Sequence, residues 1–557
     1  MYQDGKILVG KSGEECVYIY PSMANRHGLI AGATGTGKTV TLKVLAESFS
    51  DAGVPVFLAD AKGDLSGMIA EGEQTESVVK RVEKLGLAEL GFTQKSYSAS
   101  FWDVYQENGI PLRTTISEMG PTLLASILGL NDTQSDIMNI IFKIADDEGL
   151  LLIDTKDLKS MLQYVGENSD TYSQEYGNMA KQSLAAITRA VGSLESEGGE
   201  LFFGEPALDL HDWLALDEDG RGRIQILNCQ KLMLNPTMYA TFMLWLISEL
   251  FEMLPEAGDM DKPKLVFFFD EAHMLFQNMN KALLPKIEQL VKLIRSKGVG
   301  IYFITQNPKD IPDAVLAQLG NKVQHALRAY TPAEQKSVKA AAQSFRENPD
   351  FKTEEVIANL GIGEALISVL DEDGVPTIVK QCKILPPESK MGAVEDSIVV
   401  DYIKQDAMTE KYSEMYDRDS AYEFLKRKGM EEEARIEEER LAAEKEKEKL
   451  QAQKELEQIK KQEEREELKR QKEEEREHRE YEKLKEKELR EKEREKEQRR
   501  RAVSGEINRT TKNVASSVGR ELGKQIGVKI GGSSGKSLGG SVGSSLARGL
   551  FSTLLNR

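Results

Sequence analysis

The chain has 557 residues, a formal net charge of −18 and three cysteines, Cys16, Cys229 and Cys382. The acidic total excludes a basic surface over the whole molecule, so any grip on nucleic acid has to come from a local patch. The cysteines are too widely spaced for a disulfide framework or a zinc site, which favours a reducing compartment, the cytoplasm. The N-terminal residues lack the apolar core of a signal peptide, and we expect no membrane span.

Residues 1 to about 390 alternate short apolar runs with helical patterns. The apolar runs lie at 27–32, 54–60, 223–229, 264–272, 299–306 and 322–330. Because the runs are nearly all apolar and are separated by helices, they predict an α/β fold with a mainly parallel sheet covered on both faces. Residues 108–200 are helical in pattern without a clear strand. Two runs within 364–384, joined by a DEDG turn, predict a terminal hairpin.

The segment GATGTGKT matches the phosphate-binding loop pattern G-x-x-x-x-G-K-[ST] without a gap. It follows an apolar strand and begins a helix, which is the context that the pattern requires. Lys38 is expected to contact the β- and γ-phosphates of ATP, and the Thr39 hydroxyl to bind Mg²⁺. The nucleotide is expected to lie against the loop and the first residues of the helix, whose N-terminus favours anions: Gly32, Ala33, Thr34, Gly35, Thr36, Gly37, Lys38, Thr39 and Val40.

Two acidic residues and an amide follow later strands. Asp270 ends the run LVFFF, where a carboxylate is needed as a second Mg²⁺ ligand. Glu271 comes next and can polarise the attacking water, which an NTPase needs and a nucleotide binder does not. Gln306 ends the next strand, where an amide can sense the γ-phosphate; the alternative is an amide that caps a turn. These residues predict hydrolysis of ATP rather than binding alone.

Other polar residues are less clearly assigned by their pattern. A neighbouring subunit often supplies an arginine to such a site, and Arg328 is the first candidate and Arg295 the second, although each is also consistent with a packing role. Asp60, with Lys62 and Asp64 in the following loop, fits a functional strand end or a polar turn equally well. His273 is expected to hydrogen-bond and couple the site to a neighbouring loop.

The order of motifs resembles a known class of motor proteins. The letters DEAH at 270–273 also label a class of helicases, but that class has a Ser-Ala-Thr motif where this chain has ITQNP. The set LIAGATGTGKT, VFLADAKGD, LVFFFDEAH and GIYFITQNP resembles the HerA/FtsK class of RecA-like motors. The segment 123–158 and the basic ending are similar to the bacterial HerA-like C-terminal-domain family. The resemblance implies a RecA-like P-loop ATPase, a ring, typically a hexamer, and action on DNA.

Domain boundaries follow from the motifs and from composition. We expect the first part of the ATPase core at 1–107, a helical insertion at 108–222, and the rest of the core at 223–390. A helical connector is expected at 391–430. Residues 431–501 are almost wholly Glu, Lys, Arg and Gln, with Glu-to-basic pairs at i,i+4; they predict a single charged helix or a coiled coil. Residues 502–557 form a basic Gly/Ser-rich tail, with nucleic acid, an acidic membrane surface, helix packing and disorder as alternatives.

Three functions remain open from the sequence. A ring motor on DNA requires basic residues near the pore, and the candidates are Lys309, Lys281 and Lys286. An ATPase that remodels or scaffolds protein partners would use the charged helix or the tail and turn over ATP without DNA. A nucleotide-gated scaffold would bind ATP tightly and hydrolyse it slowly, which Glu271 argues against. A DNA translocase or helicase is the leading prediction.

Overall fold

The computed structural model describes residues 1–258, 260–277, 283–329 and 331–494. The chain divides into two compact units, Met1–Glu438 and Glu439–Arg557. Within the described ranges, no helix combines the length and apolar character that a membrane crossing requires.

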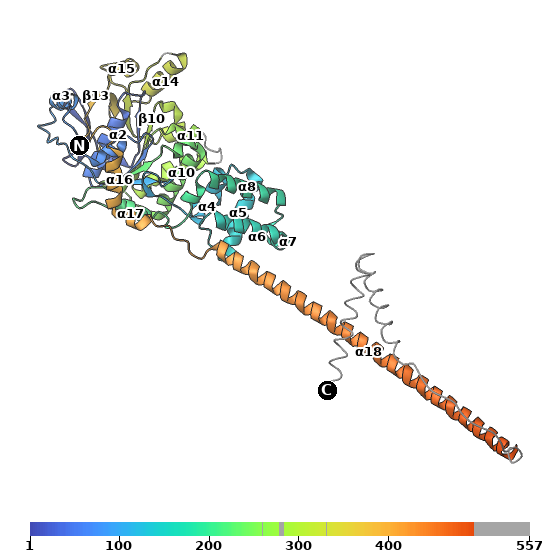
Figure 1. The fold of residues 1–557 in the computed structure, drawn as a ribbon. Coiled ribbons are helices and arrows are strands. Elements are labelled where there is room, and N and C mark those ends of the chain that lie inside the picture. Colours follow the sequence, from blue (N-terminus) through green and yellow to red (C-terminus); the bar gives the residue numbers. More distant parts are fainter. Residues whose placement is uncertain (259, 278–282, 330, 495–557) are drawn as a thin grey trace. The chain divides into compact units, whose positions relative to one another are not determined.

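The first unit is built on one mixed sheet of 13 strands (Figure 1). Its strands run in the order β1-β2-β13-β12-β11-β4-β10-β9-β5-β8-β6-β7, and β3 pairs with β2. The part from β11 to β7 is parallel, and the rest is antiparallel. The parallel strands are β4 (Gly28–Ala31), β5 (Val56–Asp60), β6 (Ala99–Asp103), β7 (Ile110–Pro111), β8 (Ile224–Asn228), β9 (Leu265–Phe269), β10 (Val299–Thr305) and β11 (Asn321–His325). The antiparallel strands are β1 (Tyr2–Gln3), β2 (Lys6–Ser12), β3 (Glu15–Ile19), β12 (Glu364–Ser368) and β13 (Lys380–Ile384).

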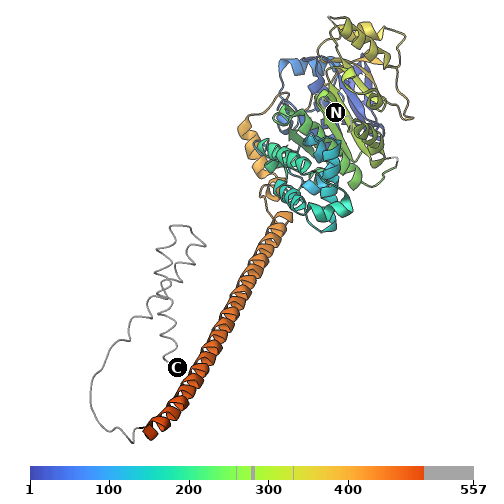
Figure 2. The ribbon, with the colours of Figure 1, turned by 90° about the vertical axis from the view of Figure 1, so that its right-hand side faces the viewer.

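Both faces of the central strands are buried, as their continuous apolar sequences predict. Along β9, Phe267 and Phe269 enter one core, and Val266 and Phe268 enter the other, because successive side chains of a strand point to opposite faces. Helices α10 (Pro236–Met253) and α12 (Leu284–Leu293) contribute to the first core. Helices α2 (Lys38–Asp51) and α16 (Asp396–Gln405) pack on the second. Figures 1 and 2 show the resulting layers, and the mainly parallel α/β fold is confirmed.

Residues 108–222 contain six helices that share the core of α10. Three begin with reciprocal capping boxes, Thr115 with Glu118, Asn131 with Gln134 and Asp154 with Asp157, which explains where they start. The expectation of no strand over 108–200 was wrong for the two-residue β7, which extends the parallel edge. The helices are α4 (Ile116–Ile127), α5 (Asp132–Asp147), α6 (Thr155–Glu167), α7 (Ser169–Tyr176), α8 (Lys181–Ser196) and α9 (Gly199–Phe202).

Two further expectations about strands need correction. The hairpin β12–β13 is present, but it does not end the sheet, because Lys383 and Ile384 pair with Lys11 and Gly10 of β2. The run 322–330 forms a strand only as far as His325, so Arg328 lies in the loop beyond β11. The remaining helices of the unit are α1 (Pro21–Ala24), α3 (Glu76–Leu85), α11 (His273–Gln277), α13 (Asp313–Leu316), α14 (Pro332–Gln343), α15 (Thr353–Asn359) and α17 (Ala407–Tyr412).

The charged segment belongs to α18 (Ala421–Arg494), which begins ten residues before the expected boundary. Within its described part, Glu457 pairs with Lys461 and Glu475 with Arg479, each at the i,i+4 spacing. Leu441, Leu450 and Leu456 are exposed within this chain. The choice between a single helix and a coiled coil stays a prediction, and the tail 502–557 lies outside the described residues.

Candidate nucleotide site

The phosphate-binding loop connects β4 to α2 at the carboxyl edge of the sheet. Its backbone is held from both neighbouring strands: Gly32 N–H donates to Thr305 O at 3.2 Å, and Ala33 N–H donates to Ala326 O at 2.8 Å. Gly37 precedes α2 in a left-handed conformation with φ of 112°, and no side chain caps the helix. The first N–H groups of α2 therefore point, uncapped by any side chain, toward the space that the loop encloses.

Lys38 is the cation of this loop. Its ammonium is buried and donates only to neutral carbonyl oxygens, Gly32 O at 2.7 Å and Ala33 O at 3.1 Å. Burial lowers the pKa of Lys38, and the charge of Lys62 lowers it further, against the opposing effect of Glu271 and Asp270. A buried ammonium held by carbonyls beside uncapped helical N–H groups fits the phosphates of a nucleotide. Thr39 follows Lys38 in the first turn of α2 and is half-buried.

Asp270 and Glu271 follow β9, two strands from β4. Asp270 is buried, and its Oδ1 accepts from Glu271 N–H at 2.9 Å. Burial raises the pKa of Asp270 to about 6, although Lys62 opposes the rise. A buried carboxylate that faces a cation is suited to a metal ion, since Mg²⁺ prefers oxygen ligands of this kind. The donor set present, Asp270 with the Thr39 hydroxyl, therefore fits Mg²⁺ bound together with phosphates.

Glu271 is held from three sides. Its carboxylate lies 3.3 Å from Lys62 Nζ and 3.3 Å from His273 Nδ1, and Gln306 Nε2 donates to it at 3.3 Å. Its backbone is left-handed, with φ of 48°, an uncommon conformation for a residue other than glycine. Backbone strain of this kind is concentrated at functional sites. The structure thus brings together Asp270, Glu271 and Gln306, and it places His273, which the sequence also singled out, against Glu271.

Lys62 reaches the acidic pair from the loop after β5. The loop is fixed by Asp60, whose carboxylate accepts from the N–H groups of Lys62, Gly63 and Leu65 at 2.7–3.1 Å. Asp60 therefore acts through the loop, and burial raises its pKa. Burial disfavours the charged form of Lys62 and by itself lowers the pKa. The charges of Asp270 and Glu271 outweigh burial, so the pKa of Lys62 is raised. Sequence reasoning left this loop undecided, because the contact between Lys62 and Glu271 depends on the strand order.

His325 is a site residue that the sequence did not indicate. It ends β11 beneath the phosphate loop, where a Cβ added to Gly32 would lie 2.5 Å from its own Cβ. Its Nδ1 donates to Glu364 O at 3.1 Å, since a carbonyl only accepts, and its Nε2 therefore accepts from the Thr41 hydroxyl at 2.8 Å. Burial, with a smaller effect from Lys38, lowers the pKa of His325 to about 4. The ring is neutral and joins α2 to β12.

The two candidate arginines lie at different edges of the sheet. Arg328 follows the strand next to the phosphate loop, but its guanidinium donates to Ala358 O at 2.5 Å and Leu360 O at 3.2 Å of its own chain. Arg295 lies before β10, at the amino edge, which is the edge away from the phosphate loop. Neither guanidinium joins the acidic pair within one chain, and a role in a neighbouring subunit stays a prediction for both.

The three lysines predicted near a pore have different surroundings. Lys309 is exposed just beyond Gln306, at the carboxyl edge. Lys286 lines a pocket together with Glu118, Glu249 and Glu252, so its charge lies among carboxylates rather than on an open basic surface. Lys281 lies outside the described residues.

A cleft of about 410 Å³ adjoins the start of α2. Gly37 and Val40 form one side, and exposed apolar side chains such as Ile362 and Met391 form another. Gly363, in the same wall, donates its N–H to Thr36 O at 3.0 Å and so ties the cleft to the phosphate loop. An apolar cleft beside a phosphate site has the chemistry that a nucleotide base requires.

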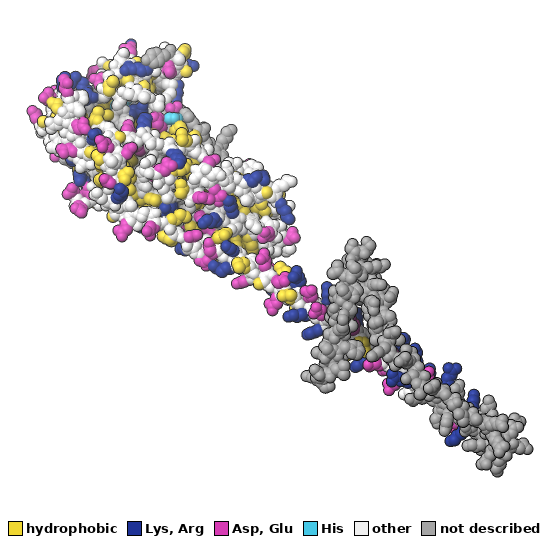
Figure 3. All heavy atoms as spheres, in the orientation of Figure 1, with side chains coloured by type: hydrophobic (Ala, Val, Ile, Leu, Met, Phe, Trp, Pro, Cys, Tyr) yellow, Lys and Arg dark blue, Asp and Glu magenta, His cyan; other side chains and the backbone are white. Residues whose placement is uncertain are grey.

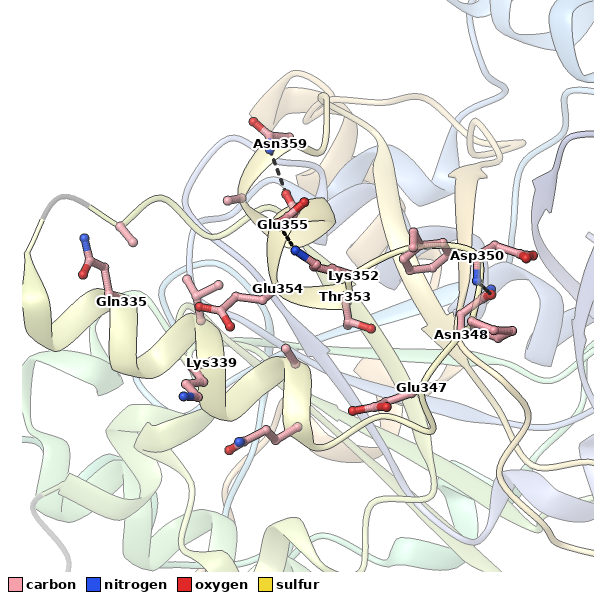
Figure 4. Close-up of a pocket in the computed structure, with 17 residues that line it drawn as sticks. Gln335, Lys339, Glu347, Asn348, Asp350, Lys352, Thr353, Glu354, Glu355 and Asn359 are labelled. Atoms are coloured by element: carbon pink, nitrogen blue, oxygen red, sulfur yellow. Dashed lines mark hydrogen bonds and ion pairs between the residues drawn. The ribbon is translucent and has the colours of Figure 1, made fainter.

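A larger open cavity, of about 1170 Å³, lies between α14 and α15 (Figure 4). Its rim carries carboxylates and lysines together, and Lys352 pairs with Glu355 at 2.9 Å. Among the residues that the structure describes, no glycine-rich loop lines it, and the helix start that does, that of α15, carries Glu354 and Glu355 in its first turn, which repel an anion. The cavity therefore lacks the features of a phosphate site, and the nucleotide site is assigned to the loop after β4.

Residues 6–537 match the family described as helicase HerA-like C-terminal. The chain belongs to this family. The DNA double-strand break repair helicase HerA of Sulfurisphaera tokodaii is 22% identical over 429 residues, which cover 74% of this chain and 76% of that protein. The protein of the same name from Saccharolobus solfataricus is 22% identical over 384 residues, which cover 66% of each.

Solved structures give a weaker likeness. The plasmid coupling protein TrwB, in complex with a non-hydrolysable GTP analogue, has a TM-score of 0.47 at 15% identity, over 71% of this chain and 91% of that chain. VirB4 of Thermoanaerobacter pseudethanolicus has a TM-score of 0.44 at 16% identity, over 69% and 97%. The resemblance to the HerA-like family is confirmed by the family match, and the chain is a P-loop ATPase of the HerA/FtsK class.

Proposed function

We propose that this ATPase is a ring motor, hexameric by its resemblance to the HerA/FtsK class, that translocates along DNA or unwinds it. The observation that carries the proposal is the contact between Gln306 and Glu271 at the carboxyl edge. Gln306 directly follows β10, the strand that pairs with both β4 and β9. A change at the γ-phosphate is thereby passed to the loop that follows Gln306, where Lys309 is exposed. The names of the two HerA relatives support DNA as the polymer.

The nucleotide roles follow the geometry described above. Lys38 and the N–H groups of the loop hold the phosphates of ATP, and Thr39 and Asp270 hold Mg²⁺. When bound, the metal neutralises phosphate charge. Glu271 orients the attacking water and accepts its proton, and Gln306 keeps the Glu271 carboxylate in position. The base lies in the cleft between Val40 and Met391.

Because the chain is acidic overall, DNA can be bound only by a small group of basic residues. Acidic and basic side chains are interspersed over the face of the first unit that Figure 3 shows. Lys309 is the described pore candidate that is both exposed and next to the site. Because contacts between lysines and phosphates release counterions, DNA binding is expected to weaken steeply with salt.

The test is steady-state ATPase activity with and without double-stranded DNA, at low and moderate salt. We expect DNA to stimulate turnover, salt to remove the stimulation, and Glu271→Gln to lower kcat by about 10²–10⁴ while ATP binding is kept. Lys309→Ala is expected to reduce the stimulation without changing turnover in the absence of DNA. Turnover that depends on Glu271 but ignores DNA would instead support an ATPase that remodels or scaffolds protein partners. Absence of turnover in the parent protein would leave a nucleotide-gated scaffold.

A further inference from the structure

Lys62 stands on the far side of the acidic pair from the phosphate loop. The strand order β4-β10-β9-β5 places it one strand beyond β9. Its Nζ lies 3.3 Å from Glu271 Oε1 and 3.9 Å from Asp270 Oδ2. Two carboxylates therefore lie between two ammonium groups, Lys38 on one side and Lys62 on the other. The charges of Glu271, Lys62 and Asp270 all affect the pKa of Lys38.

The position of Lys62 is built by its surroundings. Asp60 fixes the backbone of the loop, and Gln230 Nε2 donates to Lys62 O at 2.7 Å. A Cβ added to Gly63 would lie 2.6 Å from Gln230 Nε2, so the two segments are closely packed. The Lys62 side chain itself is 45% exposed. The backbone is thus anchored, while the side chain has room to change partner.

The charge balance of the site gives Lys62 a second partner. In the structure it compensates the carboxylates of Asp270 and Glu271. A Mg²⁺ ion held by Asp270 would supply the positive charge that Lys62 now supplies, and it would repel the Lys62 ammonium. A bound γ-phosphate would then offer Lys62 another anionic partner beside the acidic pair. Arg328 and Arg295 do not provide such a charge within one chain.

We propose that Lys62 is a catalytic residue of ATP hydrolysis that contacts the γ-phosphate within the same subunit. Water attacks the γ-phosphorus, the bond from that phosphorus to the β–γ bridging oxygen breaks, and the proton of the water passes to Glu271. Negative charge develops on the bridging oxygen of the departing ADP, while the transferred phosphoryl group stays anionic. Lys62 stabilises this group from the side opposite Lys38. The inference rests on the ATPase site and is independent of which polymer the motor acts on.

The experiment compares nucleotides that differ in the γ-phosphate. Binding of ADP and of AMP-PNP with Mg²⁺ is measured for the parent protein and for Lys62→Ala, together with ATPase turnover without DNA. We expect Lys62→Ala to weaken AMP-PNP binding by about 10-fold, because one charge-assisted contact is lost, and to leave ADP binding within about twofold. We expect kcat to fall by about 10²–10³, and Lys62→Arg to recover part of it.

Lys231→Ala is the matched control. Lys231 follows β8, the strand next to β5. Its side chain is 50% exposed and pairs with Glu107 at 2.6 Å. Replacing Lys231 by alanine should leave the affinities for ADP and AMP-PNP and the kcat unchanged. Equal loss of ADP and AMP-PNP binding in Lys62→Ala would overturn the proposal, since Lys62 would then only hold the acidic pair. Unchanged kcat would overturn it as well. Lys62→Met preserves the apolar stem and tests the charge if the alanine variant does not fold. If DNA does not change the ATPase activity of the parent protein, the proposal of action on DNA is refuted, and the proposal for Lys62 is not affected.

Discussion

Acidification is expected to destabilise the protein through His325. The ring is neutral and buried in the fold with a pKa of about 4, whereas the ordinary value for the unfolded chain is 6.5. Below pH 6.5 the unfolded chain binds a proton that the folded chain does not, so stability falls with falling pH until the folded ring also titrates near pH 4. Between pH 7.5 and pH 5 the loss from this one ring is about 2 kcal/mol.

Other groups titrate in the same range, and their effects must be removed. Burial raises the pKa of Asp270 to about 6, which acts in the opposite direction. We therefore compare the unfolding free energy of the parent and of His325→Gln, from urea titrations followed by tryptophan fluorescence at both pH values. The loss on acidification should be smaller in His325→Gln by about 2 kcal/mol, and His211→Gln controls for removal of an exposed histidine. Equal losses in the parent and in His325→Gln would refute the reasoning.

Other predictions concern packing and the metal. Gly28→Ala should lower the unfolding free energy by about 1–3 kcal/mol, because the new Cβ would lie 2.3 Å from ring carbons of Tyr302. Gly192→Ala, within α8 and with no atom within 4 Å of the added Cβ, should raise it by about 1 kcal/mol; urea titration measures both, and equal effects would contradict the packing argument. Asp270→Asn should raise the Mg²⁺ concentration for half-maximal ATPase activity by at least about tenfold, and an unchanged Mg²⁺ requirement would exclude Asp270 as a ligand.

The central strands and the phosphate loop could be predicted because their signals are local. The loop motif carries its own geometry, and an unbroken run such as LVFFF specifies a strand that is buried on both faces. Asp270 and Gln306 followed from the same logic, since the carboxyl ends of parallel strands meet at one edge. Their contact through Glu271 is what the structure adds.

Other features depend on strand order, which no local pattern encodes. His325 reaches Thr41 because β11 is the neighbour of β4, and Lys62 reaches Glu271 because β5 is the neighbour of β9. The N-terminal strands were missed because β2, KILVGKS, mixes lysine and glycine with its apolar residues. Lys286 was expected near a pore from its charge and its place in the sequence near the loop after Glu271, whereas its surroundings are set by carboxylates from α4 and α10.

The pairing of β2 with β13 also determines when the sheet can be completed during synthesis. A ribosome that adds about 5–20 residues per second needs about 20–75 s to pass from β2 to the strand that completes its edge. Gly363, which holds Thr36 of the phosphate loop, is itself held by Ile384 N–H at 2.9 Å. The nucleotide loop is therefore finished only when the last strand of the core has left the ribosome. We therefore expect a nascent chain to gain nucleotide binding only after β13 has been made, shortly before the charged helix follows.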